Sequence, residues 1–335
     1  MQKTFLTTGS AALLVIASAA CGDDTTSSTG TGASGAGGAS GGACEPSEGC
    51  PDVVSDCVAF TDNAGKDTFS LRISQLDITT PAALSSPVVA GLLNLGITQD
   101  FPACTSPDGF PLFNGDGSFN WIFEFNKTAG TVRTGGAALE TDPTAGYCYI
   151  NEMIDGFDVA PLELPVTFEA NGSFTLTGTA DVVVPIYTSP TDATSFILLP
   201  LRGVQISGGT ISEDNNCIGT FNGDGLDPQN LCLASDDAPA FLGGATLEGY
   251  ITLEDADAIE VPQLGDASLC SLLVPAEFVM DGKCIREAGE ITYEGDWCAG
   301  MPNTAGSAAT ATCKDAVRLS STFTASGATL RSDCN

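Results

Sequence analysis

Residues 164–186 read LPVTFEANGSFTLTGTADVVVPI, and this stretch carries the clearest fold signal in the 335-residue chain. Apolar and polar residues alternate on both sides of the Asn-Gly pair at 171–172. Alternation with a period of two indicates strands that are buried on one face, and Asn-Gly between two such runs is typical of a hairpin turn. The stretch therefore predicts an antiparallel β-hairpin.

The register of this hairpin follows from its apolar residues. A three-residue loop ending at Gly172 pairs Phe168 with Phe174 and Val166 with Leu176, so that four apolar side chains share one face. A two-residue loop would place the apolar residues that follow the turn opposite polar ones. We therefore expect the three-residue loop, with Gly172 in the left-handed conformation that glycine adopts readily.

The same alternation extends outward from the hairpin in both directions, with turn residues between the runs. We expect further strands at Thr68–Ile78, 119–125, Thr194–Leu201, Arg202–Ile211 and Ser321–Leu330. The chain is thus predicted to be mainly β, with antiparallel sheets arranged as a sandwich or a barrel-like structure.

Four aromatic residues, Phe119, Trp121, Phe123 and Phe125, fall on one face of the strand predicted over 119–125. Aromatic side chains suit a half-buried strand, so we favour a core role for all four. The alternative is that they line a ligand cavity.

Two or three short helices are expected among the strands. Apolar residues recur at helical spacing over 87–96, after a proline that suits a first helical turn. Thr252 with Asp255 resembles a capping box at a second helix start. A further helix is predicted over Asp266–Val274.

The chain contains 13 cysteines and no C-x-x-C pair, so disulfides are expected rather than a zinc site. Spacing suggests three pairings but does not decide connectivity. They are Cys217 with Cys232, Cys298 with Cys313, and Cys104 with Cys148.

Residues 1–20 have the layout of an export signal: Lys3 near the start, an apolar run at 11–17, and small residues before Cys21. The apolar run is too short for a permanent membrane span. A Gly/Ser/Thr-rich stretch at 22–43 then has the composition of a flexible tether.

These first 43 residues resemble the surface lipoproteins of Gram-negative bacteria, particularly myxobacteria. The resemblance implies that Cys21 is diacylated and becomes the mature N-terminus, which anchors the chain to the outer membrane or cell surface. Ser18 departs from the leucine that is usual three residues before the cysteine. Cleavage by an ordinary signal peptidase near 17–19 is therefore the alternative. Lipidation of Cys21 would leave an even number of cysteines to pair.

Charge and composition exclude several classes of function. Eleven Lys and Arg face 42 Asp and Glu, and the net charge of −31 opposes binding to nucleic acid. The acidic surface either serves solubility, which we favour, or attracts divalent cations or basic partners. Because the chain has no histidine, Ser-His-Asp and Cys-His catalysis and His-ligated zinc are excluded.

Two short blocks recur at one offset. FNGDG at 113–117 returns at 221–225, and GGAALE at 135–140 returns as GGATLE at 243–248; both offsets are 108 (221 − 113 and 243 − 135). The repeat reflects either a duplication that produced two related halves or one turn type used twice.

The acidic residues of the second block raise the question of calcium. Asn222, Asp224 and Asp227 offer oxygen ligands, although the spacing is not that of an EF-hand. We favour a Gly-Asp hairpin turn and keep an irregular calcium site as the alternative. No other cofactor is indicated.

The expected organisation is a signal peptide at 1–20, the lipid-anchor cysteine and tether at 21–43, a cysteine-rich segment at 44–58, and a β-rich domain at 59–335. The sequence favours a lipid-anchored cell-surface binding or structural module rather than an enzyme. A carrier of a small apolar ligand or lipid is the main alternative, and a hydrolase based on paired carboxylates is a less favoured one.

Overall fold

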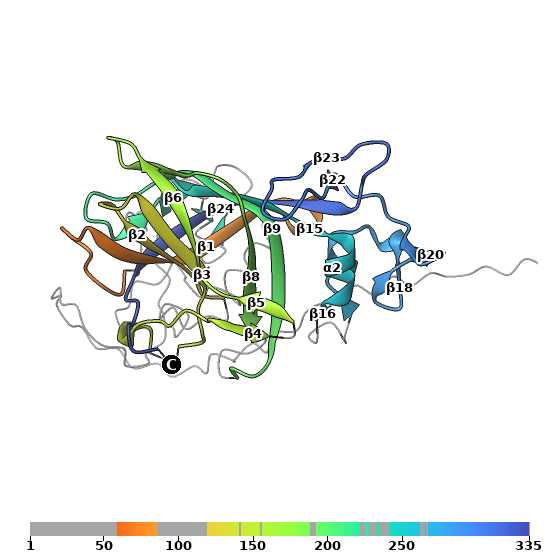
Figure 1. Ribbon diagram of the computed structural model, residues 1–335, viewed down its shortest axis with the longest axis horizontal. Helices are drawn as coiled ribbons and strands as arrows, with labels where there is room; N and C mark the ends of the chain where they lie inside the picture. The colour runs from red at the N-terminus through yellow and green to blue at the C-terminus, as the bar shows by residue number, and fades with distance from the viewer. Residues whose placement is uncertain are drawn as a thin grey trace, which may run out of the picture.

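A computed structural model describes residues 59–85, 119–140, 142–154, 156–187, 192–221, 226–227, 233–234, 241–261, 265 and 267–334. The described residues are mainly β, with 54% in strands and 9% in helices, as the alternating patterns predict (Figure 1).

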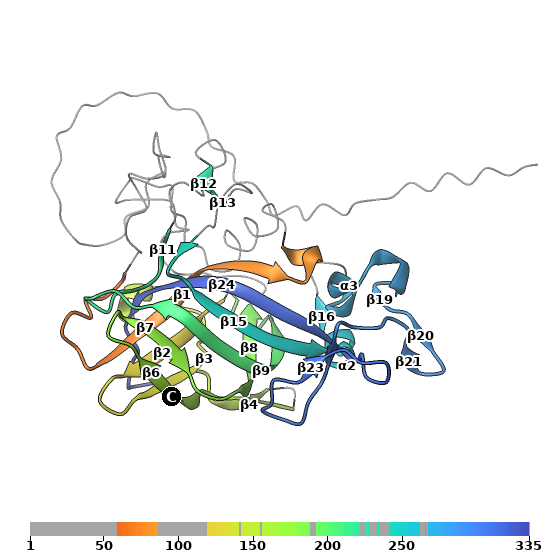
Figure 2. The ribbon, with the colours of Figure 1, turned by 90° about the horizontal axis from the view of Figure 1, so that it is seen from above.

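Eight antiparallel strands form a closed barrel. Each strand pairs with the next along the chain, and the last pairs with the first, so the sheet closes on itself. Figure 2 shows β9, β15, β24 and β1 side by side. The eight strands are β1 (Thr68–Thr80), β2 (Trp121–Asn126), β3 (Thr131–Gly136), β6 (Leu162–Phe168), β7 (Ser173–Leu176), β9 (Phe196–Thr210), β15 (Ala245–Thr252) and β24 (Ala316–Ala328).

Shorter elements decorate this barrel. The 3-10 helices are η2 (Ala82–Leu84), η5 (Pro143–Ala145) and η9 (Ala276–Phe278), and the α-helices are α2 (Leu253–Ala258) and α3 (Cys270–Leu273). The further strands are β4 (Glu152–Ile154), β5 (Phe157–Val159), β8 (Ala180–Tyr187), β10 (Cys217–Ile218), β11 (Thr220–Phe221), β12 (Leu226–Asp227), β13 (Leu233–Ala234), β14 (Phe241–Leu242), β16 (Glu260–Val261), β17 (Ala267–Ser268), β18 (Val279–Met280), β19 (Lys283–Cys284), β20 (Arg286–Glu287), β21 (Glu290–Ile291), β22 (Trp297–Cys298) and β23 (Ser307–Ala308).

The hairpin that opened the sequence analysis forms β6 and β7 with the predicted register. Phe168 pairs with Phe174 and Val166 with Leu176. Gly172 has a φ of 83°, and its N–H donates to the carbonyl of Glu169 at 3.0 Å. The choice of the three-residue loop is therefore confirmed.

The two strands predicted at 194–201 and 202–211 are wrong as separate elements, because residues 196–210 form the single strand β9. One edge of β9 pairs first with β8 and then with β7. The backbone bends at Gly203, whose φ is 59°. The pairings with β8 and β15 shift register near that residue. A bulge thus replaces the expected chain reversal.

Aromatic rings fill the middle of the barrel. Phe125 lies 5.4 Å from Phe69 and 5.2 Å from Phe174 between ring centroids, and Phe123 stacks on Phe323 at 5.5 Å. Eight strands enclose a space that side chains can fill, and here these rings fill it. The core role favoured for the aromatic strand is confirmed for its residues.

The helices agree with the sequence in part. The Thr252 hydroxyl accepts the N–H of Asp255 at 3.0 Å and caps α2, as predicted. The helix expected over Asp266–Val274 is shorter, because residues 267–268 pair as β17 with β16 before α3 begins at Cys270. The helix predicted over 87–96 lies outside the described residues.

Three disulfides join described cysteines. Cys298 pairs with Cys313 as predicted, and Cys270 pairs with Cys284. The pairing of Cys104 with Cys148 is wrong, since Cys148 is bonded to Cys334. That bond ties the segment after β3 to the C-terminus, where Tyr147 also forms a parallel bridge with Leu330.

Cys217 is disulfide-bonded as well, and its predicted pairing with Cys232 stays a prediction because Cys232 lies outside the described residues.

The described residues between 253 and 291 form a side lobe next to the barrel, built from α2, α3 and short hairpins (Figure 1). Its own apolar cluster includes Leu253, Ala256, Leu273 and the Cys270–Cys284 disulfide. Among the described residues, no helix is both long and apolar enough to span a membrane.

Candidate functional site

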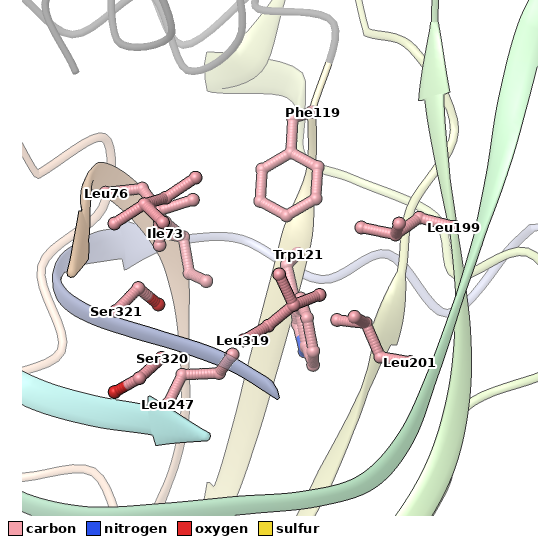
Figure 3. A pocket seen from close by; sticks show the side chains of 11 residues that line it. Ile73, Leu76, Phe119, Trp121, Leu199, Leu201, Leu247, Leu319, Ser320 and Ser321 are labelled. Carbon is pink, nitrogen blue, oxygen red and sulfur yellow. The ribbon is translucent and has the colours of Figure 1, made fainter. Parts of the chain in front are cut away.

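A cavity of about 80 Å³ lies at one end of the barrel interior. Nine of its 11 lining residues are apolar. They come from β1, β2, β9, β15 and β24, and from Phe119, which lies two residues before β2. Figure 3 places Ile73 and Leu76 on one side of the cavity and Leu199 and Leu201 on the other. Apolar side chains from several strands thus converge on one concave surface.

Strand register explains why these side chains converge. On β24, Ser321 lies directly opposite Ile78 of β1 and Leu247 of β15, and all three line the cavity. Residues directly opposite each other on neighbouring strands point to the same face of the sheet. The row across β1, β24 and β15 therefore forms one wall of the cavity.

A bulge in β1 supplies a second part of that wall. The pairing of β1 with β24 shifts between Ile73 and Gln75, so that Ser74 is extra. Without the shift, Ile73 and Leu76 would point to opposite faces of the strand. With it, both line the cavity.

The aromatic strand contributes the floor. Phe119 and Trp121 line the cavity, whereas Phe123 and Phe125 continue into the packed aromatic core. The indole N–H of Trp121 donates to the Thr134 hydroxyl at 2.7 Å, so the ring presents only apolar surface to the cavity. All four aromatic residues belong to the buried core, and Phe119 and Trp121 also line the cavity. That the cavity takes a ligand stays a prediction.

The walls grade from buried to half-exposed. Ile73, Trp121 and Leu247 are buried, whereas Leu76 and Leu199 are half-buried. The cavity opens to solvent at the end where these half-buried residues lie. An open apolar cavity of this kind can exclude water from a small apolar group, and this is the chemistry it offers.

The opposite end of the barrel carries a more polar groove of about 410 Å³. Lys127, Glu169, Asn171 and Glu213 lie along it. The Lys127 ammonium donates to the side chain of Asn215 at 2.6 Å, so this cation is held by the protein. Among the polar residues that line the groove, none is buried.

Among the described carboxylates, Asp257 is the buried one, and it lies in the side lobe. It accepts hydrogen bonds from Arg286 at 2.8 Å, from the Cys284 N–H at 2.9 Å and from the Ser268 hydroxyl at 3.0 Å. Burial raises the pKa of Asp257, but these hydrogen bonds outweigh it and hold the pKa below the usual value. The carboxylate therefore organises the lobe, and no second buried carboxylate of the described chain lies beside it.

The suggested calcium ligands fall largely outside the described part of the chain. Asn222 and Asp224 lie outside it, and Asp227 is described only as part of β12, without its side chain. Two groups of cysteine and aspartate lie close enough to hold an ion, but in both the cysteines form disulfides. The calcium suggestion stays a prediction.

The repeated blocks lie in different settings where they are described. Gly135 and Gly136 end β3, whereas Gly243 and Gly244 precede β15. The FNGDG blocks lie almost wholly outside the described residues, and so do Cys21, the tether and the cysteine-rich segment at 44–58.

Sequence reasoning found the aromatic floor of the cavity but missed its aliphatic walls. Leu247, Leu319 and Leu201 lie on strands that are far apart in the sequence, and a leucine on an alternating strand looks the same whether it faces a packed core or a cavity. Comparison with family models, curated proteins and solved structures finds no match for this chain.

Proposed function

We propose that this chain is an exported binding module, displayed at the cell surface by a lipid on Cys21, that takes a small apolar group into the cavity at the barrel end. The cavity is the observation that carries the proposal. The signal-like segment, the tether composition and the disulfides support export and display.

The physical argument for binding rests on unfilled apolar surface. Protein interiors are normally packed to crystal-like density, and a void lined by leucine and aromatic rings forfeits contacts that a guest would restore. Engineered apolar cavities of about 150 Å³ bind benzene or xenon for this reason.

The volume limits the size of the guest. At about 80 Å³, the cavity has roughly half the volume of those benzene-binding cavities, so it fits a group of a few carbon atoms. A whole acyl chain does not fit inside. The guest is therefore a compact apolar molecule or the compact end of a larger one, which narrows the carrier alternative suggested by the sequence.

Narrowing the mouth is the direct test. Ile78 lines the cavity and is half-buried, so Ile78→Phe adds bulk there while leaving the buried core untouched. The affinity of the full exported chain for xenon is measured by xenon NMR. Ile78→Phe is expected to bind xenon roughly tenfold more weakly than the wild type, or more, which corresponds to a loss of about 1.4 kcal/mol. Ile78→Val is the matched control and is expected to bind at least as well as the wild type. Equal xenon binding by Ile78→Phe and wild type, or none by the wild type, would contradict the proposal.

The anchor has its own test. Protein extracted from the membranes of an expressing Gram-negative host is expected to carry added acyl mass at its N-terminal cysteine. Cys21→Ala is expected to lose that mass and to appear in the soluble fraction, because one or more acyl chains are then missing. Intact-mass spectrometry of both proteins decides the matter. A wild-type mass without acyl groups would refute the anchor and leave the cavity proposal standing.

A further inference from the structure

One polar side chain interrupts the apolar wall of the cavity on its buried side. Ser321 has 4% of its surface exposed and lines the cavity between the inward-facing residues Leu319 and Phe323 of β24. Its neighbours across the two flanking strands, Ile78 and Leu247, also line the cavity. Figure 3 shows the Ser321 hydroxyl directed toward the space between Ser321 and Trp121.

Within the described part of the chain, the Ser321 hydroxyl has no hydrogen-bond partner. Other polar groups nearby are engaged. The Ser74 and Thr324 hydroxyls bond each other at 3.1 Å, and the Thr79 hydroxyl donates to the backbone carbonyl of Ser320 at 3.1 Å. The Ser321 oxygen is not among the fully buried polar atoms of the described chain that lack a partner, so it keeps some accessible surface on the cavity side. A guest that fills the cavity without bonding to this hydroxyl would bury it unpaired, which is unfavourable.

Serine at position 321 also leaves part of the cavity unfilled. The other inward positions of this half of β24 hold leucine and phenylalanine, and both pack against the apolar core. A leucine or phenylalanine at position 321 would fill part of the cavity and remove the unsatisfied hydroxyl. Serine does neither, since it keeps the cavity open and places one donor and two acceptor sites on its wall.

We infer that Ser321 is a specificity-determining residue, and that the guest is a compact aliphatic group of about three or four carbons bearing one hydroxyl or carbonyl oxygen that bonds to Ser321. This inference rests on the proposed binding at the same cavity. The carbon atoms contact the leucine and aromatic walls, and the oxygen lies toward β24. A guest without the oxygen leaves the buried hydroxyl unpaired and binds less well.

A matched pair of probes tests the inference. Isobutanol and isopentane have nearly the same shape, and a hydroxyl in the first replaces a methyl group in the second. Trp121 lines the cavity, and the chain has two tryptophans, so Trp297→Phe leaves Trp121 as the reporter of binding by fluorescence. Affinities are measured for both probes on the full oxidised chain in this background, with Ser321 present and with Ser321→Ala.

Ser321→Ala is expected to weaken isobutanol binding by roughly five- to tenfold, the effect of one neutral hydrogen bond. Isopentane binding is expected to stay equal or to strengthen slightly, because the variant no longer buries an unpaired hydroxyl. Comparing the same probe across the two proteins removes the difference in how water solvates the probes. Ser321→Cys, which keeps the size but is a weak hydrogen-bond donor, is expected to behave like Ser321→Ala.

The outcomes separate the two proposals. If both probes bind but Ser321→Ala and Ser321→Cys change isobutanol no more than isopentane, the inference is overturned and the apolar site remains. A water molecule that stays on Ser321 when isobutanol is bound would overturn it as well. If neither probe binds to any of the proteins, the proposed function fails together with the inference. If Ser321→Ala does not fold, the Ser321→Cys measurement decides.

Discussion

Phe125→Ala is expected to lower the free energy of unfolding by about 3–5 kcal/mol, the range for truncating a fully buried phenylalanine. Phe125 is 0% exposed. Its ring lies 5.4 Å from Phe69, 5.2 Å from Phe174 and 6.0 Å from Phe168 between centroids. Truncation removes buried apolar area and leaves a void that these rigid rings cannot collapse to fill.

The measurement is equilibrium denaturation in guanidinium chloride with the disulfides intact. Met301→Ala provides the control, because Met301 is 76% exposed and its truncation is expected to change the free energy by less than about 0.5 kcal/mol. Phe125→Leu keeps most of the volume and is expected to fall between the two. A loss below about 1 kcal/mol for Phe125→Ala would show that the barrel interior is not packed around this ring.

The second large effect is expected from the disulfide between Cys148 and Cys334. It joins residues 186 apart, and the chain-entropy treatment of the unfolded state assigns such a loop about 5 kcal/mol. Replacing both cysteines by serine frees the C-terminus from the segment after β3. The backbone bonds of Tyr147 with Thr329 and Arg331, the Arg331–Glu140 ion pair and the packing of Leu330 against Tyr147 remain.

A second disulfide of the same chain is the matched control. Cys298 and Cys313 are only 15 residues apart, so the corresponding double serine variant is expected to lose about 3 kcal/mol. Thermal unfolding followed by circular dichroism gives both values under one set of conditions. If the short-loop variant were the less stable of the two, loop closure would not be the main source of stabilisation at Cys148–Cys334.

The cavity exists because the barrel interior is filled by aromatic side chains in the middle and by smaller aliphatic side chains at one end. Stacked aromatic rings fill the middle, and at one end the strands continue with leucine and isoleucine, which are shorter and do not reach across. The β1 bulge turns Ile73 and Leu76 to the same side and thereby shapes the wall. The proposed ligand site thus lies where the side chains inside the barrel are too small to fill the space between the strands.

Most predictions that rest on neighbouring residues agree with the structure; the exception is the Asp266–Val274 helix, which is shorter because residues 267–268 pair with β16. The register of β6 and β7 and the Thr252 cap of α2 each depend on residues within one turn or hairpin. The Cys298–Cys313 bond closes a loop of only 15 residues. Local sequence is informative here because the interacting groups are held close together by the chain itself, and few alternatives compete.

Two predictions that needed distant partners are wrong. β9 reads as two strands because a glycine and an arginine interrupt its apolar run, yet β7, β8 and β15 pair along its length and hold it in one piece. Cys148 has a cysteine 44 positions earlier in the chain, but its partner is Cys334, which barrel closure brings beside it. Sequence spacing does not report distances that are set by the closure of a sheet.

By itself, the sequence determined the mainly β class, the central hairpin and its register, and the aromatic strand that forms the core and the cavity floor. It also carries the export and anchor pattern at Cys21, which remains a prediction. Only the tertiary structure decided that the strands close into a barrel, that β9 is continuous, and that Ser321 lies on the wall of an apolar cavity. The reason is physical: period-two alternation specifies which face of a strand is buried, but which strands meet, and whether the space between them is filled, depends on pairing across the whole chain.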